Sequence, residues 1–383
     1  MFETSTIELS SSALRNNLRF IRKRMKAGVR LCSVVKGNAY GHGISEFVQM
    51  AMDLGVDYFA VHAAEEAYQL KQNLSLMPDL FIMGEIEDHA IEWAIKNQIE
   101  FSAFDFSRLE TALNYSVKLQ IKAKIHLEIE TGLRRTGFDQ GQIPELCDWL
   151  KINSEHIIFQ GLFTHFAGAE SQANYFRISN QLRIFNTTLN HFKSENLNPV
   201  YYHTACSAAL LNYPETPGNM VRIGILQYGF WPNNETYIHF CGEKIRNPNL
   251  LIRVIRWTSK VMAIKEVTKG EFVGYGTTFL AQKKMKLAII PIGYSHGYSR
   301  NLSNFGSVLI NGKNAPVVGT VNMNSITVDI TSISNVEKGD EVVLIGKQKG
   351  KEITVNSFSE QSKLLNYELL TRLPTNIHRI KTN

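Results

Sequence analysis

A lysine that could take part in catalysis lies directly after one of several short apolar runs. Lys36 follows the run 30–35, and burial at the end of a strand lowers the pKa of a lysine, so that its neutral amine can act as a nucleophile or a base. The alternative is that Lys36 only extends its charge into solvent from a strand end. Position alone leaves both interpretations open.

Other segments carry groups suited to anions. The string ETGLRRTG (130–137) holds Arg134 and Arg135, and the planar fork of arginine matches a carboxylate or phosphate. Pairing with Glu130 inside a surface loop is the alternative. Ser207 and Gly224 follow two later runs, and a hydroxyl beside backbone N–H groups at such ends commonly holds phosphate. We expect Ser207 to cap the helix that follows it, which would also explain its presence.

Three histidines also follow apolar runs, at His62, His165 and His203. Converging imidazoles can bind zinc, which would indicate a metal-dependent hydrolase. The expected carboxylate partners and an HxH pair are missing from the sequence, so we expect no metal site and treat each histidine as a hydrogen-bonded strand-end residue.

The elements that must position these residues follow a repeating pattern. Eight short runs rich in Val, Ile, Phe and Tyr recur in the first 230 residues, at 30–35, 57–61, 79–83, 100–103, 124–129, 159–164, 200–203 and 221–226. Most gaps between them show amphipathic helical periodicity. Eight strand-helix units of this length predict an α/β fold, a (β/α)8 TIM-type barrel, whose chemistry lies at the C-terminal strand ends.

A second domain follows the barrel. From residue 250 onward, strand-like stretches succeed one another without long helical patterns, beginning with 251–264, and Asn311-Gly312 is a strong hairpin signal. We therefore predict a barrel domain over 10–235 and a mostly-β domain over 236–383.

Composition excludes several other classes. Hydrophobic residues make up 44% of the 383 and charged residues 20%, which is typical of a globular protein. The net charge of +6 is spread along the chain, and its densest basic run, 22–26, lacks interleaved aromatic residues, so we expect no nucleic-acid partner. Four scattered cysteines and the lack of a leader-like or membrane-spanning apolar run predict a cytoplasmic protein without membrane association.

The motifs together resemble a known family across nearly the whole chain. VVKGNAYGHG (34–43) is similar to the lysine motif of alanine racemases, the fold-type III enzymes that use pyridoxal 5'-phosphate (PLP). Further segments match in order: ETGLRRTGF, THFAGAE, HTACSAAL, VRIGILQYG, GYGTTF, PIGYSHGY, VGTVNMN and NYELLTRLP. The resemblance implies a barrel with a C-terminal β domain to which residues 1–9 add a strand, and a head-to-tail homodimer with shared active sites.

The resemblance also implies a role for individual residues. Lys36 would hold PLP, and Lys36 and Tyr275 would be the two catalytic bases, with Tyr275 reaching the partner subunit's site. The other implied cofactor-binding residues are Tyr40, His165, Ser207, Arg222, Gly224 and Ile225, with Arg222 at the pyridine nitrogen. The implied substrate-binding residues are Arg135, Met323 and Tyr294, the last at the entrance.

The implied activity is interconversion of L- and D-alanine for peptidoglycan synthesis. A racemase of broader or different amino-acid substrate is the alternative, and a PLP-binding protein without turnover is a third. The sequence departs from the family pattern at Glu128, Cys206, His296, Asn324 and Thr375. Glu128 stands where many members carry a carbamylated lysine, so we expect its carboxylate to hydrogen-bond Arg135, or Arg134 if the loop turns differently.

Overall fold

The computed structural model describes residues 3–216, 218–242, 250–355 and 366–383. The chain divides into two compact units. The barrel unit consists of Ala13–Gly37 and Val48–Ile252, and the β unit consists of Met1–Ser12, Asn38–Phe47 and Arg253–Asn383. A ten-residue segment after the first barrel strand thus belongs to the β unit.

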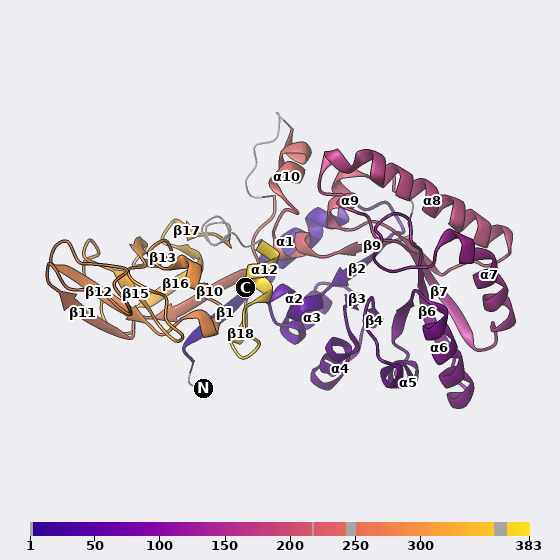
Figure 1. The fold of residues 1–383 in the computed structure, drawn as a ribbon, viewed down its shortest axis with the longest axis horizontal. Coiled ribbons are helices and arrows are strands. Elements are labelled where there is room, and N and C mark those ends of the chain that lie inside the picture. The colour runs from indigo at the N-terminus through magenta and orange to yellow at the C-terminus, as the bar shows by residue number, and fades with distance from the viewer. Residues whose placement is uncertain (1–2, 217, 243–249, 356–365) are drawn as a thin grey trace. The chain divides into compact units, whose positions relative to one another are not determined.

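The barrel unit is built on eight parallel strands in the order β8-β7-β6-β5-β4-β3-β2-β9, which form a nearly closed barrel (Figure 1). Their bounds are β2 Arg30–Val34, β3 Tyr58–Val61, β4 Asp79–Ile82, β5 Glu100–Ala103, β6 Ala123–Glu128, β7 Ile157–Phe163, β8 Tyr201–His203 and β9 Met220–Ile223. Most of their residues are buried, as expected where helices cover the outside of a parallel sheet. The predicted α/β barrel is confirmed.

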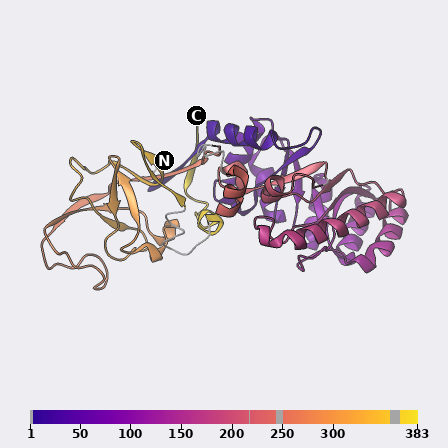
Figure 2. The same cartoon turned by 90° about the horizontal axis from the view of Figure 1, so that it is seen from above.

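Helices cover the outer side of these strands (Figures 1 and 2). They are α1 Ser11–Arg22, α3 Ile44–Met52, α4 Ala64–Asn73, α5 Asp88–Lys96, α6 Phe106–Leu119, α7 Ile143–Ile152, α8 Tyr175–Ser194 and α9 Ser207–Asn212. Helix α10 (Asn234–Cys241) lies against α1, with the ring centroids of Phe240 and Phe20 5.6 Å apart. Helix α1 shows why they pack this way, because Leu14, Leu18 and Ile21 recur at helical spacing and are fully buried.

The β unit contains a larger and a smaller sheet. The larger has the order β14-β13-β16-β10-β1-β18, with β17 paired to β16, and the smaller has the order β11-β12-β15. Their strands are β1 Ser5–Ser10, β10 Ile255–Lys260, β11 Ala263–Val267, β12 Met285–Ile290, β13 Ser307–Ile310, β14 Lys313–Pro316, β15 Ile326–Asp329, β16 Glu341–Gln348, β17 Lys351–Ile353 and β18 His378–Thr382. Helix α12 spans Asn366–Thr371. The mostly-β prediction for this region is confirmed.

Two local expectations in the β unit have different outcomes. Asn311 and Gly312 both have positive φ, 53° and 77°, and join β13 to β14 as the hairpin signal predicted. The single strand expected over 251–264 is wrong. It is divided into β10 and β11, because Val261 donates to Asp340 O while Met262 donates to Ile289 O, so the chain passes from one sheet to the other.

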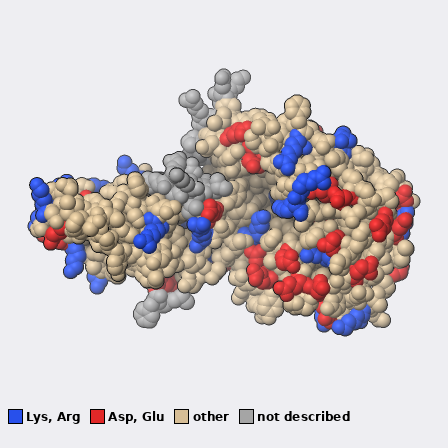
Figure 3. Space-filling model, viewed as in Figure 1, with Lys and Arg blue, Asp and Glu red and all other residues tan. Residues whose placement is uncertain are grey.

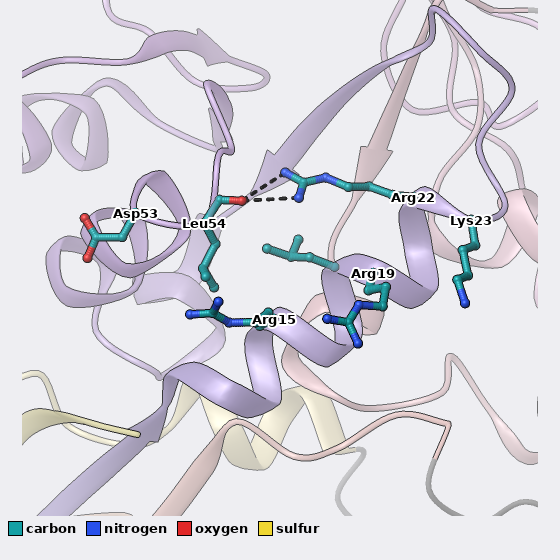
Figure 4. A pocket seen from close by; sticks show the side chains of 7 residues that line it. Arg15, Arg19, Arg22, Lys23, Asp53 and Leu54 are labelled. Atoms are coloured by element: carbon teal, nitrogen blue, oxygen red, sulfur yellow. Dashed lines mark hydrogen bonds between the residues drawn. The ribbon is translucent and has the colours of Figure 1, made fainter.

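The basic run 22–26 begins at the last residue of α1. Arg22 donates to the carbonyls of Leu54 and Gly55, at 3.1 and 2.7 Å from Nη2, beside a groove of about 610 Å³ (Figure 4). Arg24 stacks on Phe20, with its guanidinium carbon 3.4 Å from the ring centroid. Lys and Arg stand among Asp and Glu on the face of the barrel unit in Figure 3. The described helices include none that is long and apolar enough to span a membrane.

Candidate active site at the C-terminal strand ends

Lys36 begins a turn of left-handed helix, α2 (Lys36–Tyr40), after β2. Gly37, Asn38, Ala39 and Tyr40 have φ values between 51° and 63°. Left-handed backbone is costly for residues that carry a Cβ, and such strain persists only where surrounding contacts hold it. Asn38 provides one such contact, because its Oδ1 accepts a 2.9 Å hydrogen bond from Ile44 N.

The surroundings of Lys36 lower the pKa of its amine. Its side chain is accessible in the isolated chain, yet desolvation by surrounding atoms lowers the pKa, and repulsion from Arg135 and Arg222 lowers it further. Glu66 acts in the opposite direction. A lysine with a lowered pKa at the barrel mouth has the property that a nucleophile or base requires.

Glu66 is a residue that the sequence analysis missed. It lies in the first turn of α4, where its Oε1 accepts from Gly37 N at 2.6 Å and its Oε2 accepts from His62 N at 2.8 Å. One carboxylate therefore joins the loops that follow β2 and β3. The acidic pair Glu65-Glu66 in the first turn of α4 was the available signal.

Arg222 lies in β9, where it is 4% exposed. Its guanidinium donates to His203 Nδ1, to His203 O at 2.9 Å and to Thr164 O at 2.8 Å. His165 follows β7, and burial together with the charges of Arg222, Arg135 and Lys36 lowers its pKa to about 3. His165 is therefore a neutral ring close to Arg222, Arg135 and Lys36.

Buried polar groups hold the loop that carries His165. Gln181 of α8 donates to His165 O at 3.0 Å and accepts from Ala167 N at 2.9 Å. Its amide also donates to Thr131 Oγ1, which lies 2.7 Å from Thr164 Oγ1. The sequence analysis did not single out Gln181, because an amide inside a helical pattern gives no signal that it is fully buried.

Ser207 and Gly224 meet at the ends of β8 and β9. The Ser207 hydroxyl accepts from Gly224 N at 3.0 Å, and Ile225 begins a short 3-10 turn directly after Gly224. The expectation that Ser207 caps the following helix is wrong: Cys206 is the N-cap residue, and Ser207 is the first residue of α9. The serine side chain instead connects two strand ends.

Arg135 and Glu128 form an ion pair. Arg135 Nη2 lies 3.7 Å from Glu128 Oε1, which is too long for the hydrogen bond that was expected. The hydrogen bond to Glu128 comes from Thr136 Oγ1 at 2.7 Å. Arg134 pairs with Asp139 instead, with 3.7 Å between Arg134 Nη1 and Asp139 Oδ1. The predicted pairing with Arg135 thus exists as an electrostatic contact between a buried carboxylate and a largely exposed guanidinium.

The remaining implied site residues belong to the β unit. Tyr40 is buried, with its ring centroid 5.9 Å from that of Tyr367. Tyr275 is 75% exposed between two glycines of positive φ, and its carbonyl accepts from Thr320 Oγ1 at 3.1 Å. Tyr294 and Met323 are also exposed, and they are linked because Ser295 N donates to Met323 O at 3.0 Å.

The three strand-end histidines do not form one cluster. His203 is buried behind Arg222, His165 lies near Lys36, and the backbone of His62 is held by Glu66. Within the described part of the chain, no three His, Cys, Asp or Glu side chains are grouped so as to hold a metal ion.

Comparison with known proteins identifies the family. Residues 9–232 match the model of the alanine racemase N-terminal domain, and residues 254–381 match that of the C-terminal domain. An alanine racemase of Methanococcus maripaludis is 32% identical over 97% of this chain and 97% of its own length.

Solved structures give the same result. The alanine racemase of Clostridium difficile 630 has a TM-score of 0.89 and 28% identity, covering 100% of this chain and 96% of its own. A histidine racemase from Leuconostoc mesenteroides subsp. sake has a TM-score of 0.86 and 26% identity, covering 100% and 98%. The fold and these matches define a racemase, a class of isomerase. The chain belongs to the alanine racemase family.

Proposed function

We propose that this protein is a PLP-dependent alanine racemase that interconverts L- and D-alanine and supplies D-alanine for peptidoglycan in the cytoplasm. The observation that carries the proposal is the lowered pKa of Lys36 beside Arg222, Arg135 and His165 at the C-terminal ends of the strands. A lysine whose pKa is lowered by desolvation and by two neighbouring arginines is suited to act as a base.

The residues at the mouth fit PLP. The Ser207 hydroxyl and the Gly224 backbone, joined at 3.0 Å, present small polar groups suited to a phosphate, with Ile225 beside them and Tyr40 as the fourth assigned contact. His165, neutral because burial lowers its pKa, is assigned to the flank of the ring. When bound, PLP supplies the electron sink that acidifies the α-proton of an amino acid.

Each assigned residue then has a defined task. Inversion at the α-carbon requires one base on each face, and Lys36 and Tyr275 are assigned to the two faces. Arg222, assigned to the pyridine nitrogen, is permanently charged and so disfavours protonation there. This limits delocalisation of charge into the ring and favours return of the proton.

The substrate carboxylate is assigned to Arg135 and to the backbone of Met323, with Tyr294 at the entrance. The exposed guanidinium of Arg135 can turn toward an incoming carboxylate while Glu128 remains behind it. Tyr275 is assigned to the site of a partner subunit in a homodimer, and its 75% exposure in one chain supports this assignment. The proposed domains are 10–235 and 236–383, with residues 1–9 in the second.

The second candidate is a racemase of broader or different substrate. The histidine racemase with the same fold at 26% identity favours it, because side-chain specificity evidently changes within this architecture. The two candidates are distinguished by comparing the racemisation rates of several amino acids under identical conditions.

The test follows α-deuterium incorporation and loss of optical rotation with L-alanine in deuterium oxide, and repeats it with L-histidine and L-serine. We expect alanine to exchange and racemise fastest. Faster turnover of another amino acid would replace the alanine assignment, and no exchange by protein supplied with PLP would refute the racemase assignment. Borohydride reduction and peptide mapping should place the cofactor on Lys36, with Lys36→Ala as the control.

A further inference from the structure

A row of hydrogen-bonded side chains crosses the barrel interior and ends at Arg222. Glu100 is the first residue of β5, and its Oε2 lies 2.7 Å from His126 Nε2 on β6. His126 Nδ1 lies 3.0 Å from His203 Nε2 on β8. His203 Nδ1 contacts Arg222 Nη1 on β9. We call these four residues the barrel relay, and each is at least nine-tenths buried.

The two ends of the barrel relay determine the position of every proton in it. Arg222 can only donate, so His203 Nδ1 must accept and His203 carries its proton on Nε2. The Nε2–H of His203 donates a hydrogen bond to His126 Nδ1. Because His126 Nδ1 accepts, His126 also carries its proton on Nε2. The Nε2–H of His126 donates a hydrogen bond to Glu100, which as a carboxylate can only accept. Only neutral imidazoles in this one tautomer satisfy all three contacts.

Other groups reinforce the carboxylate end. The Tyr58 hydroxyl donates a hydrogen bond to Glu100 Oε2, and Gln160 Nε2 donates one to Glu100 Oε1 at 2.9 Å. Burial raises the pKa of Glu100, but the interactions with His126, the hydrogen bond from Tyr58 and the charge of Lys124 lower it, so the pKa lies below its ordinary value. The carboxylate is therefore charged, and it is a countercharge to Arg222 inside the barrel.

Aromatic rings cover both imidazoles. His126 stacks on Phe81 with ring centroids 4.1 Å apart, and His203 stacks on Phe163 at 5.1 Å with the rings nearly parallel. Burial lowers the pKa of both histidines, that of His203 well below its ordinary value. The apolar ring faces keep the chain of hydrogen bonds away from water. In such an interior, hydrogen bonds strengthen one another.

Other ionisable groups surround the barrel relay. The charge of Lys124 lowers the pKa of Glu100, Glu128 and Arg135 act on Arg222, and the charge of Arg222 lowers the pKa values of Lys36 and His165. Cys32 and Cys206 also lie near Arg222. All of these except Lys124 lie near Arg222. Glu100 is the carboxylate that is hydrogen-bonded into the same chain as Arg222.

We propose that Glu100 and His126 are positioning residues for Arg222: the barrel relay holds its guanidinium toward the site and supplies its countercharge through two neutral imidazoles. The proposal rests on the proposed function, because Arg222 is assigned there to the cofactor ring. Glu100 and His126 themselves touch neither substrate nor cofactor.

The first test measures protonation directly, without reference to activity. In ¹⁵N NMR of histidine-labelled protein, the signals of His126 and His203 are assigned by their loss in His126→Gln and His203→Gln. We expect both rings to be neutral with the proton on Nε2, unchanged from pH 6 to 8. Titration of either ring in this range, or a proton on Nδ1, would overturn the barrel relay. This result stands whether or not the protein racemises alanine.

The second test separates positioning from mere packing. Glu100→Gln keeps the shape and can still accept from His126, but it removes the charge. We expect kcat for alanine to fall about tenfold or more while KM changes less than about threefold, since alanine's carboxylate is assigned to Arg135 instead. The matched control is Glu110→Gln, an exposed carboxylate that accepts from Trp149 Nε1 at 2.9 Å.

Tyr58→Phe is the second variant, because it removes one donor and leaves the charge of Glu100 in place. We expect it to retain kcat within about threefold and to retain both histidine signals. Unchanged kcat in Glu100→Gln, or equal changes in kcat and KM, would show that Glu100 has no positioning role. If Glu100→Gln does not fold, the wild-type histidine spectra still decide the proposal, because titration of either ring between pH 6 and 8, or a proton on Nδ1, would overturn it.

Discussion

At the scale of single residues, Glu128 shows how a carboxylate can influence the site without a direct hydrogen bond to its arginine. It is buried and accepts from Thr136, while Arg135 lies 3.7 Å away and is mostly exposed. Exposed ion pairs contribute little, whereas a buried partner is screened less by water. The role of Glu128 is therefore to bias where Arg135 points.

We predict that Glu128→Gln lowers kcat/KM for alanine by about three- to tenfold, because Arg135 loses its charged partner but keeps the contacts with substrate that we assign to it. Steady-state kinetics with both alanine enantiomers measure this. Asp139→Asn is the control, since Asp139 pairs with Arg134 instead. An unchanged kcat/KM in Glu128→Gln, or an equal loss in Asp139→Asn, would contradict the role given to Glu128.

At the scale of elements, the left-handed turn after β2 combines strain with close packing. Gly41 has φ +78°, and a Cβ placed there would lie 1.9 Å from Leu370 O. Arg379 Nη2 donates to Gly41 O at 3.0 Å, so the glycine is held at its carbonyl as well. Only a residue without a side chain fits this position.

We predict that Gly41→Ala lowers the unfolding free energy by more than about 2 kcal/mol, from positive-φ strain plus the clash with the Leu370 carbonyl. Urea denaturation measures it. Gly350→Ala is the matched control in the same unit, because Gly350 has φ +82° and nothing within 4 Å of its Cβ position, so it reports strain alone. Equal losses in the two variants would mean that the close approach to Leu370 adds nothing.

The sequence allowed the barrel to be predicted because buried parallel strands are continuous apolar runs, and Asn311-Gly312 allowed one hairpin to be predicted because a type I′ turn needs positive φ at both positions. It did not allow the side-chain partners to be predicted. Ser207 bonds Gly224 rather than capping its own helix, and Glu128 bonds Thr136 rather than Arg135. Such choices depend on distances between separate strands, which no local pattern contains. The individual catalytic and binding roles stay predictions.

At the scale of the whole molecule, four histidines with lowered pKa values make stability depend on pH. Burial lowers the pKa of His42 to about 4 and that of His165 to about 3, and it lowers those of His126 and His203 as well. In the unfolded chain each ring has an ordinary pKa near 6.5. Below that pH the unfolded state binds protons that the folded state does not.

We therefore predict that the unfolding free energy falls as pH decreases from 7 toward 5.5, by up to about 1.4 kcal/mol per pH unit for each neutral histidine. Urea unfolding at several pH values and one protein concentration measures this slope. His165→Gln should reduce this slope by the contribution of one histidine. A slope that is flat, or that is the same in His165→Gln and wild type, would show that these rings take up protons in the folded state.

The last prediction concerns the proposed homodimer. If Tyr275 acts in the partner's site, each site needs Lys36 from one chain and Tyr275 from the other. A heterodimer of Lys36→Ala and Tyr275→Phe chains then contains one site with both bases and one site with neither. Because random mixing makes half of the dimers heterodimers, activity should return to roughly one quarter of the wild-type value per site, although both parents are inactive.

The measurement is alanine racemisation after the two variants are mixed and left to exchange subunits, with exchange followed by mass spectrometry of differently tagged chains. The control is a mixture of Lys36→Ala with the double variant Lys36→Ala/Tyr275→Phe, which can form no complete site in either arrangement. Exchange without recovered activity would mean that both bases come from one chain. That result would leave the racemase assignment in place and remove the shared site, because a single chain would then supply a base to each face of the substrate.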